Sequence, residues 1–240
     1  MKNILVLSFI FLNVVTCFSQ QRQNVKCIYK IYTPFDKPNY KPDTASDIVL
    51  KSKPLSYVLE IEQTNSKFYP KDEMALENID GLSLRIRKIL SFNSSSVEID
   101  ILKDEIFETS HDGTIRIGIK TKISDFKWTI TSESKFIDQY KCYKAICQIT
   151  ERGRDDAIVI KDVIAYFCPA LNYQCGPREF AGLPGLILEV THNNTVIGLE
   201  SIVISENYEG KKLIPASRAD LKIFTSYFDF DKYRSEYKKL

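Results

Sequence analysis

The sequence predicts a mainly β protein, folded as a single curved antiparallel meander sheet or as a half-barrel or sandwich, with a C-terminal helix. Apolar and polar residues alternate with a period of two over much of the chain, which is typical of strands with one buried face. Polar turn sequences separate consecutive alternating runs. Hydrophobic residues make up 44% of the 240 residues, which is enough to build the core of one domain.

Residues 1–19 have the pattern of a signal peptide. Lys2 precedes the apolar run 4–15, and Ser19 places a small side chain just before the expected cleavage site. Lipid attachment at Cys17 is an alternative, although threonine before that cysteine is unusual. After Ser19 no apolar run approaches the roughly 20 residues of a membrane span. We therefore expect an exported protein that is not transmembrane after signal removal, in the periplasm, at the outer membrane or outside the cell.

Alternation predicts a series of strands along the mature chain. In chain order these are residues 25–32, 57–62, 97–102, 115–120, 128–134, 140–151, 158–167, 186–192 and 195–205. Asp112-Gly113 predicts a tight hairpin between the runs 97–102 and 115–120. Asn193-Asn194 predicts a second turn, between the last two strands.

Two segments favour helix instead. Good helix formers predict a short helix near 73–80, and Ser217 is expected to cap a final helix within the tail 206–240. The proline-rich segment 34–54 is expected to be a surface loop. No segment has the composition of a linker, so residues 20–240 are predicted to form one domain.

Five cysteines remain after the leader is removed: Cys27, Cys142, Cys147, Cys168 and Cys175. An odd number leaves at least one thiol outside any intramolecular disulfide. Cys142 and Cys147 are five residues apart in a predicted strand and should lie on opposite faces. A bent loop separates Cys168 from Cys175, and we predict a disulfide between them.

Charge and motifs exclude several function classes. The 33 basic and 31 acidic residues give a net charge of +2, and they form no basic region of the kind that nucleic-acid binding requires. The chain contains no catalytic or nucleotide-binding motif. His111 and His192 lie in turn-like sequence and are expected to be solvated. We therefore predict no catalytic residue, no metal ligand and no cofactor.

The segment before the strand at residue 186 is unusually rich in glycine and proline. The residues that define this signature turn are Gly176, Pro177, Gly182, Leu183, Pro184, Gly185, Leu186 and Ile187. Pro184-Gly185 fits the central positions of a type II turn. One interpretation is structural, with the turn fixing the strand and Leu183 filling the core. The other is that the loop presents Tyr173, Arg178 and Phe180 to a partner or ligand.

These residues resemble a known family. The string 182–187 is the signature of the GLPGLI family of exported Bacteroidetes proteins (the Porph_ging-type domain), and blocks at 128–137, 140–145 and 176–180 are also similar, with the clearest resemblance over 128–200. The resemblance implies a signal peptide and a mainly β domain. The family is largely of unknown function, and some members are encoded near TonB-dependent outer-membrane transporters.

The preferred hypothesis is a non-enzymatic envelope protein that binds a ligand or partner, accessory to a TonB-dependent transporter or to another envelope protein. A thiol-dependent enzyme is the first alternative. The second is a transition-metal site formed by Cys27, Cys142 and a histidine.

Overall fold

A computed structural model describes residues 24–32, 55–71, 96–112, 115–152, 157–205, 213, 215 and 217–237. The predicted signal peptide with Cys17, the proline-rich segment 34–54 and the helix expected near 73–80 lie outside these ranges. Within them the protein is mainly β, with one open sheet and one C-terminal helix, as the sequence predicts. No helix in the described ranges is long and apolar enough to cross a bilayer.

The described part of the chain contains twelve strands, one 3-10 helix and one α-helix. They are β1 (Asn24–Tyr32), β2 (Leu55–Glu62), β3 (Asn65–Pro70), β4 (Ser96–Asp100), β5 (Glu105–Asp112), β6 (Ile115–Thr121), the 3-10 helix η3 (Ile123–Asp125), β7 (Thr129–Ile137), β8 (Tyr140–Arg152), β9 (Ile158–Cys168), β10 (Leu186–His192), β11 (Thr195–Ser205), β12 (Lys222–Phe224) and α3 (Tyr227–Tyr237).

Two antiparallel meanders make up the sheet. The strand order is β12-β6-β5-β4-β3-β2-β1-β11-β10-β9-β8-β7, so β1–β6 and β7–β11 each run in sequence and join where β1 pairs with β11. β12 lies parallel to β6 at one edge, and the sheet is therefore mixed rather than wholly antiparallel.

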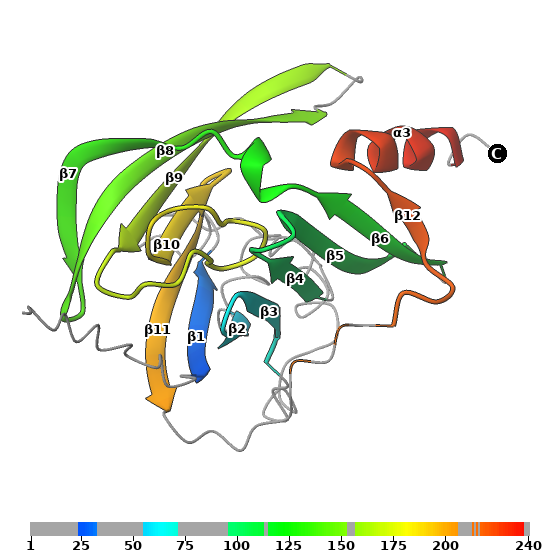
Figure 1. Cartoon of the computed structure of the whole chain (residues 1–240). Coiled ribbons are helices and arrows are strands. Elements are labelled where there is room, and N and C mark those ends of the chain that lie inside the picture. Colours follow the sequence, from blue (N-terminus) through cyan, green and yellow to red (C-terminus); the bar gives the residue numbers. More distant parts are fainter. Residues whose placement is uncertain are drawn as a thin grey trace, which may run out of the picture.

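The sheet bends so that its two meanders face each other. Figure 1 shows β7–β9 on one side and β4–β6 on the other, with the yellow loop 169–185 between the two halves. The segment 122–128, which contains η3, connects β6 in one meander with β7 at the far edge of the other. The bend creates the space that the loop fills.

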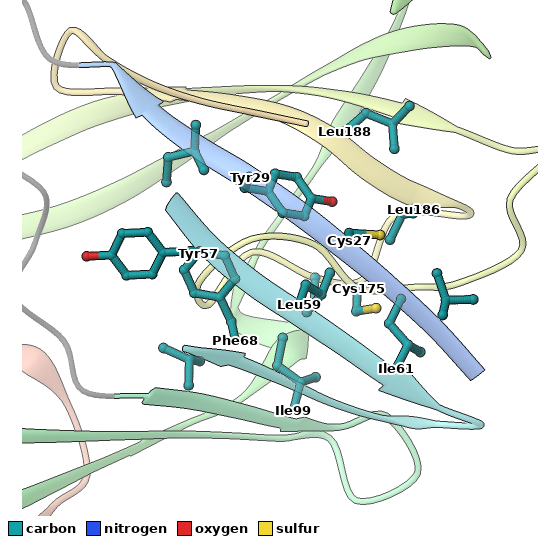
Figure 2. Packing of buried hydrophobic residues seen from close by; sticks show 14 of the residues in the cluster. Cys27, Tyr29, Tyr57, Leu59, Ile61, Phe68, Ile99, Cys175, Leu186 and Leu188 are labelled. Carbon is teal, nitrogen blue, oxygen red and sulfur yellow. The ribbon is translucent and has the colours of Figure 1, made fainter. Parts of the chain in front are cut away.

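A first apolar cluster lies mainly over β1–β4 (Figure 2). Tyr57 and Phe68 stack with ring centroids 5.1 Å apart, and Tyr29 meets Phe68 edge-on. The buried Tyr29 hydroxyl donates a hydrogen bond to the Ile187 carbonyl at 2.7 Å. Complete burial of side chains of this size stabilises the fold by about 1.5 to 3 kcal/mol each.

A second cluster lies over β8–β10 and receives Phe180 and Leu183 from the loop. Cys142 belongs to the first cluster and Cys147 to the second. The two cysteines therefore occupy opposite faces of β8, as predicted. Both clusters include residues of the 169–185 loop, which therefore packs between the two meanders.

The final helix begins later than predicted. Residues 222–224 pair with β6 as β12, so Ser217 does not cap α3. Instead the Ser226 hydroxyl accepts a hydrogen bond from the Asp229 amide at 3.0 Å, and the Thr225 hydroxyl donates to the Asp229 carboxylate. Pairing with a strand edge thus overrides the apolar periodicity that favoured a longer helix.

The hairpin predicted at Asp112-Gly113 joins different strands from those expected. β4 turns at residues 101–104 into β5, a strand that alternation did not indicate. β5 then pairs with β6, with Asp112 opposite Ile115. β3 was also not predicted, because its polar sequence lacks a clear apolar alternation.

Candidate functional site

A cavity of about 540 Å³ lies where the two meanders face each other, beside α3. Its walls come from the end of β6 and the η3 segment, from β8, from the end of β10 and from the first turns of α3. The loop 169–185 contributes Arg178 and Glu179. Segments distant in sequence therefore meet here only because the sheet bends.

Arg178 occupies a strained position in this wall. Its φ is 57°, in the left-handed region that non-glycine residues seldom adopt, yet its side chain is buried. The turn is held from both sides, since the Phe180 amide donates to the Pro177 carbonyl and the Trp128 indole donates to the Ala181 carbonyl at 2.8 Å. A backbone conformation of this kind is often found at functional sites.

Arg178 lies at the centre of a buried charge cluster. Its Nε is 2.9 Å from Oε2 of Glu179, and its Nη2 is 3.9 Å from Oε2 of Glu108 on β5. The Tyr227 hydroxyl, at the start of α3, donates a hydrogen bond of 2.5 Å to the same Glu108 oxygen. Glu108, Arg178 and Glu179 are each no more than 6% exposed.

Burial and charge act against each other in this cluster. Burial raises the pKa of Glu108 to about 7, although the nearby Arg178 charge opposes the increase. Burial also raises the pKa of Tyr227 well above its usual value, and the Glu108 charge adds to this effect. For Arg178, burial alone would lower the pKa, but the charges of Glu179 and Glu108 outweigh it and raise the pKa. Arg178 therefore stays positively charged.

His192 also lines the cavity, which contradicts the expectation of a solvated turn residue. It is the last residue of β10 and only 5% exposed, with Nε2 2.9 Å from Oε1 of Glu151. Burial lowers the pKa of His192 more than Glu151 raises it, so the ring is neutral at neutral pH. His111 is exposed as expected, but it lies in β5.

The three residues expected to face a partner lie in different environments. Phe180 is completely buried in the second cluster, so the expectation that it contacts a partner is wrong. Arg178 is buried too, but it lines the cavity. Tyr173 is half-buried against the first cluster, and its partner-facing role stays a prediction.

The signature turn packs into the core. Leu183, Leu186 and Ile187 are at most 1% exposed. Gly182 has a φ of 89° and Gly185 a φ of 153°. The Gly185 value is far from the roughly 80° of a type II turn, so that turn type is not formed. What requires glycine at 185 is the close approach of the backbone at Cys168 and Pro169.

The predicted disulfide between Cys168 and Cys175 is absent. All five cysteines of the described ranges are free and buried. Cys168 ends β9, opposite Leu186, whereas the Cys175 carbonyl accepts a hydrogen bond from the Ile187 amide. The Cys175 thiol lies in the first cluster with Cys27 (Figure 2). A charge on Cys175 would raise the pKa of Cys27, and a charge on either sulfur would raise the pKa of Tyr29. The loop thus directs the two sulfurs to different neighbours.

We expect the thiols of the folded protein to be unreactive. Burial raises the pKa of Cys142, Cys147 and Cys175 to about 12 each, and it raises the pKa of Cys27 even further. Because the thiolate is the reactive form, an aromatic disulfide reagent should modify these thiols only after unfolding in guanidinium chloride. A thiol that reacts rapidly in native protein beginning at Gln20 would contradict this expectation and would support a thiol-dependent enzyme.

Most residues of this site carry no local signal in the sequence. Glu108 lies in a strand where residues 106–109 are all buried, and such a strand shows no alternation. Glu151 and Tyr227 join the site only through long-range packing. The one local signal was the charged pair Arg178-Glu179 inside an otherwise apolar, turn-rich segment. Within the residues that the structure describes, no group of three or more His, Cys, Asp or Glu side chains is arranged to hold a metal ion.

Comparison with known proteins identifies similarity of fold only. No protein-family model matches the sequence, and no curated protein matches it. Two solved structures of PNGF-II, in space groups C2 and P21, are similar, with TM-scores of 0.51 and 0.53 and sequence identities of 12% and 13%. The matches cover 88% and 87% of this chain, which spans only 32% of the length of each PNGF-II chain.

Proposed function

We propose that this protein is an exported cell-envelope protein of the GLPGLI family that binds a small ligand in the cavity beside Arg178, as an accessory to a TonB-dependent transporter or another envelope protein. The observation that carries the proposal is the buried charge cluster at that cavity. Burying Glu108, Arg178 and Glu179 together opposes folding through desolvation, and Arg178 adds backbone strain. A binding role accounts for retaining such a costly arrangement.

The geometry favours binding over acid–base catalysis. The carboxyl group whose pKa is about 7 is Glu108, which would suit proton transfer at neutral pH. However, Glu108 is not among the described residues that line the cavity. It lies behind that lining, where it accepts a hydrogen bond from Tyr227 and is close to Arg178. Its geometry therefore serves to hold Arg178 and α3 in position.

Export and family membership are supported by the sequence of residues 1–19 and by the string 182–187. The thiol-dependent alternative receives no support from the cysteines of the described ranges, which are all buried. Burial also raises the pKa of Cys142, Cys147 and Cys175. The fold is also consistent with binding, because loops held on a rigid scaffold often carry binding residues.

Native mass spectrometry of protein isolated from envelope fractions tests the proposal. We expect an additional bound mass, which should be lost in Thr150→Trp, because Thr150 lies at an exposed strand position that lines the cavity and the indole would fill it. Thr129→Trp, at an exposed position of β7 outside the cavity lining, is the matched control and should retain the ligand. Protein from the envelope that carries no additional bound mass would overturn the proposal.

A further inference from the structure

We infer that the ligand carries a cationic amine or guanidinium group attached to an apolar ring or chain. This inference rests on the proposed binding function and specifies its chemistry. It is drawn from the charge of the cavity wall, from the partners that those charges already have, and from the aromatic side chains beside them.

The cavity wall has an excess of negative charge. Four carboxylates line it (Asp125, Glu151, Glu179 and Asp231), against two permanent cations (Lys122 and Arg178). The lowered pKa of His192 leaves that ring neutral at neutral pH. An anionic ligand would therefore enter a wall with two more negative than positive charges, whereas a cation would reduce the imbalance.

The existing contacts increase this preference. Arg178 is the only described cation buried in the wall, and its charge is already balanced by Glu179 at 2.9 Å and Glu108 at 3.9 Å. Lys122 is exposed at the rim. Among the described residues, the contacts of Glu151 are instead with neutral groups, namely His192 and the Asn193 amide at 3.2 Å. Its negative charge thus remains available to a ligand.

Aromatic rings complete the wall. Phe126 and Phe228 both line the cavity, and Phe228 is 44% exposed. Phe126 is held in place by Trp128 and Phe180, with ring centroids 6.0 and 5.7 Å away. Ring faces attract cations and also bury apolar surface. A wall that combines carboxylates with aromatic rings suits an ammonium or guanidinium group linked to an apolar body.

Three probes of similar shape and different charge test the inference: 2-phenylethylamine, 2-phenylethanol and 3-phenylpropionate. We expect titration calorimetry at low ionic strength to show that the amine binds about tenfold more tightly than the alcohol, a ratio that corresponds to roughly 1.4 kcal/mol. The carboxylate should bind more weakly still. Added salt should reduce the preference for the amine, because it screens charge in an open cavity.

Two substitutions in α3 test whether a carboxylate of the cavity causes the preference for the amine. Asp231→Asn removes a cavity carboxylate and should weaken amine binding severalfold while leaving alcohol binding unchanged. Glu236→Gln removes a charge from the same helix at an exposed position outside the lining and should change neither. Thermal melts of both variants establish that they are folded.

The possible failures separate the ligand class from the binding function. If the alcohol or the carboxylate binds as tightly as the amine, or if Asp231→Asn and Glu236→Gln have equal effects, the cationic ligand is excluded while the binding function stands. Failure of all three probes, with a bound mass still detected in the native protein, also excludes the inference. Absence of that bound mass refutes the proposed function itself.

Discussion

Replacing Arg178 with methionine is expected to lower the free energy of unfolding by about 3 to 5 kcal/mol, the range for removing one partner of a buried ion pair. Methionine approximates the length of the side chain but leaves Glu179 and Glu108 buried without their cation. Urea unfolding followed by tryptophan fluorescence measures the change, since Trp128 is the only tryptophan and donates to the loop that carries Arg178.

The loss should depend on pH in a defined direction. The pKa of Glu108 is raised from 4.5 to about 7 on folding. The folded state therefore binds the proton more tightly, and stability falls as pH rises from about 4.5 through about 7. Without Arg178 only the Tyr227 hydrogen bond still opposes the effect of burial, and the pKa of Glu108 should rise further. Arg178→Met should consequently lose less stability at acidic pH, where Glu108 is protonated, than at alkaline pH.

Two further variants serve as controls for the Arg178 prediction. Adding Glu108→Gln to Arg178→Met should restore part of the lost stability at alkaline pH, because it removes one uncompensated charge. Lys122→Met, a change of the same kind at the exposed rim of the cavity, should alter the free energy of unfolding by no more than about 0.5 kcal/mol. A pH-independent loss of stability in Arg178→Met would contradict the proposed charge cluster.

The strands were the most predictable part of the fold. Alternation in the sequence located nine of the twelve strands to within a few residues. In strands such as β1 and β4 that pattern corresponds to an alternation of buried and more exposed side chains. β5 was missed for the opposite reason: Ile106 and Phe107 are adjacent and both buried. β12 was mistaken for helix, since three residues at a sheet edge carry no pattern of their own.

Long-range pairing was not predictable from local pattern. Nothing in the sequence of β1 indicates that it pairs with β11, the contact that joins the two meanders. The same limit applies to the site: Glu108, Glu151, His192 and Tyr227 come from four different elements. Their residue types suggested solvated positions, because charged side chains are mostly exposed. Only the bend of the sheet brings them together around Arg178.

The predicted disulfide failed for a related reason. Pro169, Asn172 and the Gly176-Pro177 pair just after Cys175 correctly indicated a bent loop, but not the direction in which it places each sulfur. Ile187 and Leu186 hold the two ends of that loop through backbone hydrogen bonds, from the Ile187 amide to Cys175 and from the Leu186 amide to Leu171. The geometry of the signature turn therefore decides the position of both cysteines.

Gly185→Ala is expected to lower the free energy of unfolding by about 3 kcal/mol, from backbone strain and overpacking together. An added Cβ would lie 2.3 Å from the Cys168 carbonyl oxygen and 2.9 Å from the Pro169 Cα, and backbone atoms cannot move aside as a flexible side chain can. Gly198→Ala in β11 is the matched control: its Cβ would meet no atom within 4 Å. Because alanine restricts the unfolded chain more than glycine does, that change should be neutral or slightly stabilising. Equal urea midpoints for the two variants would show that the signature turn does not require its close backbone contact with Cys168.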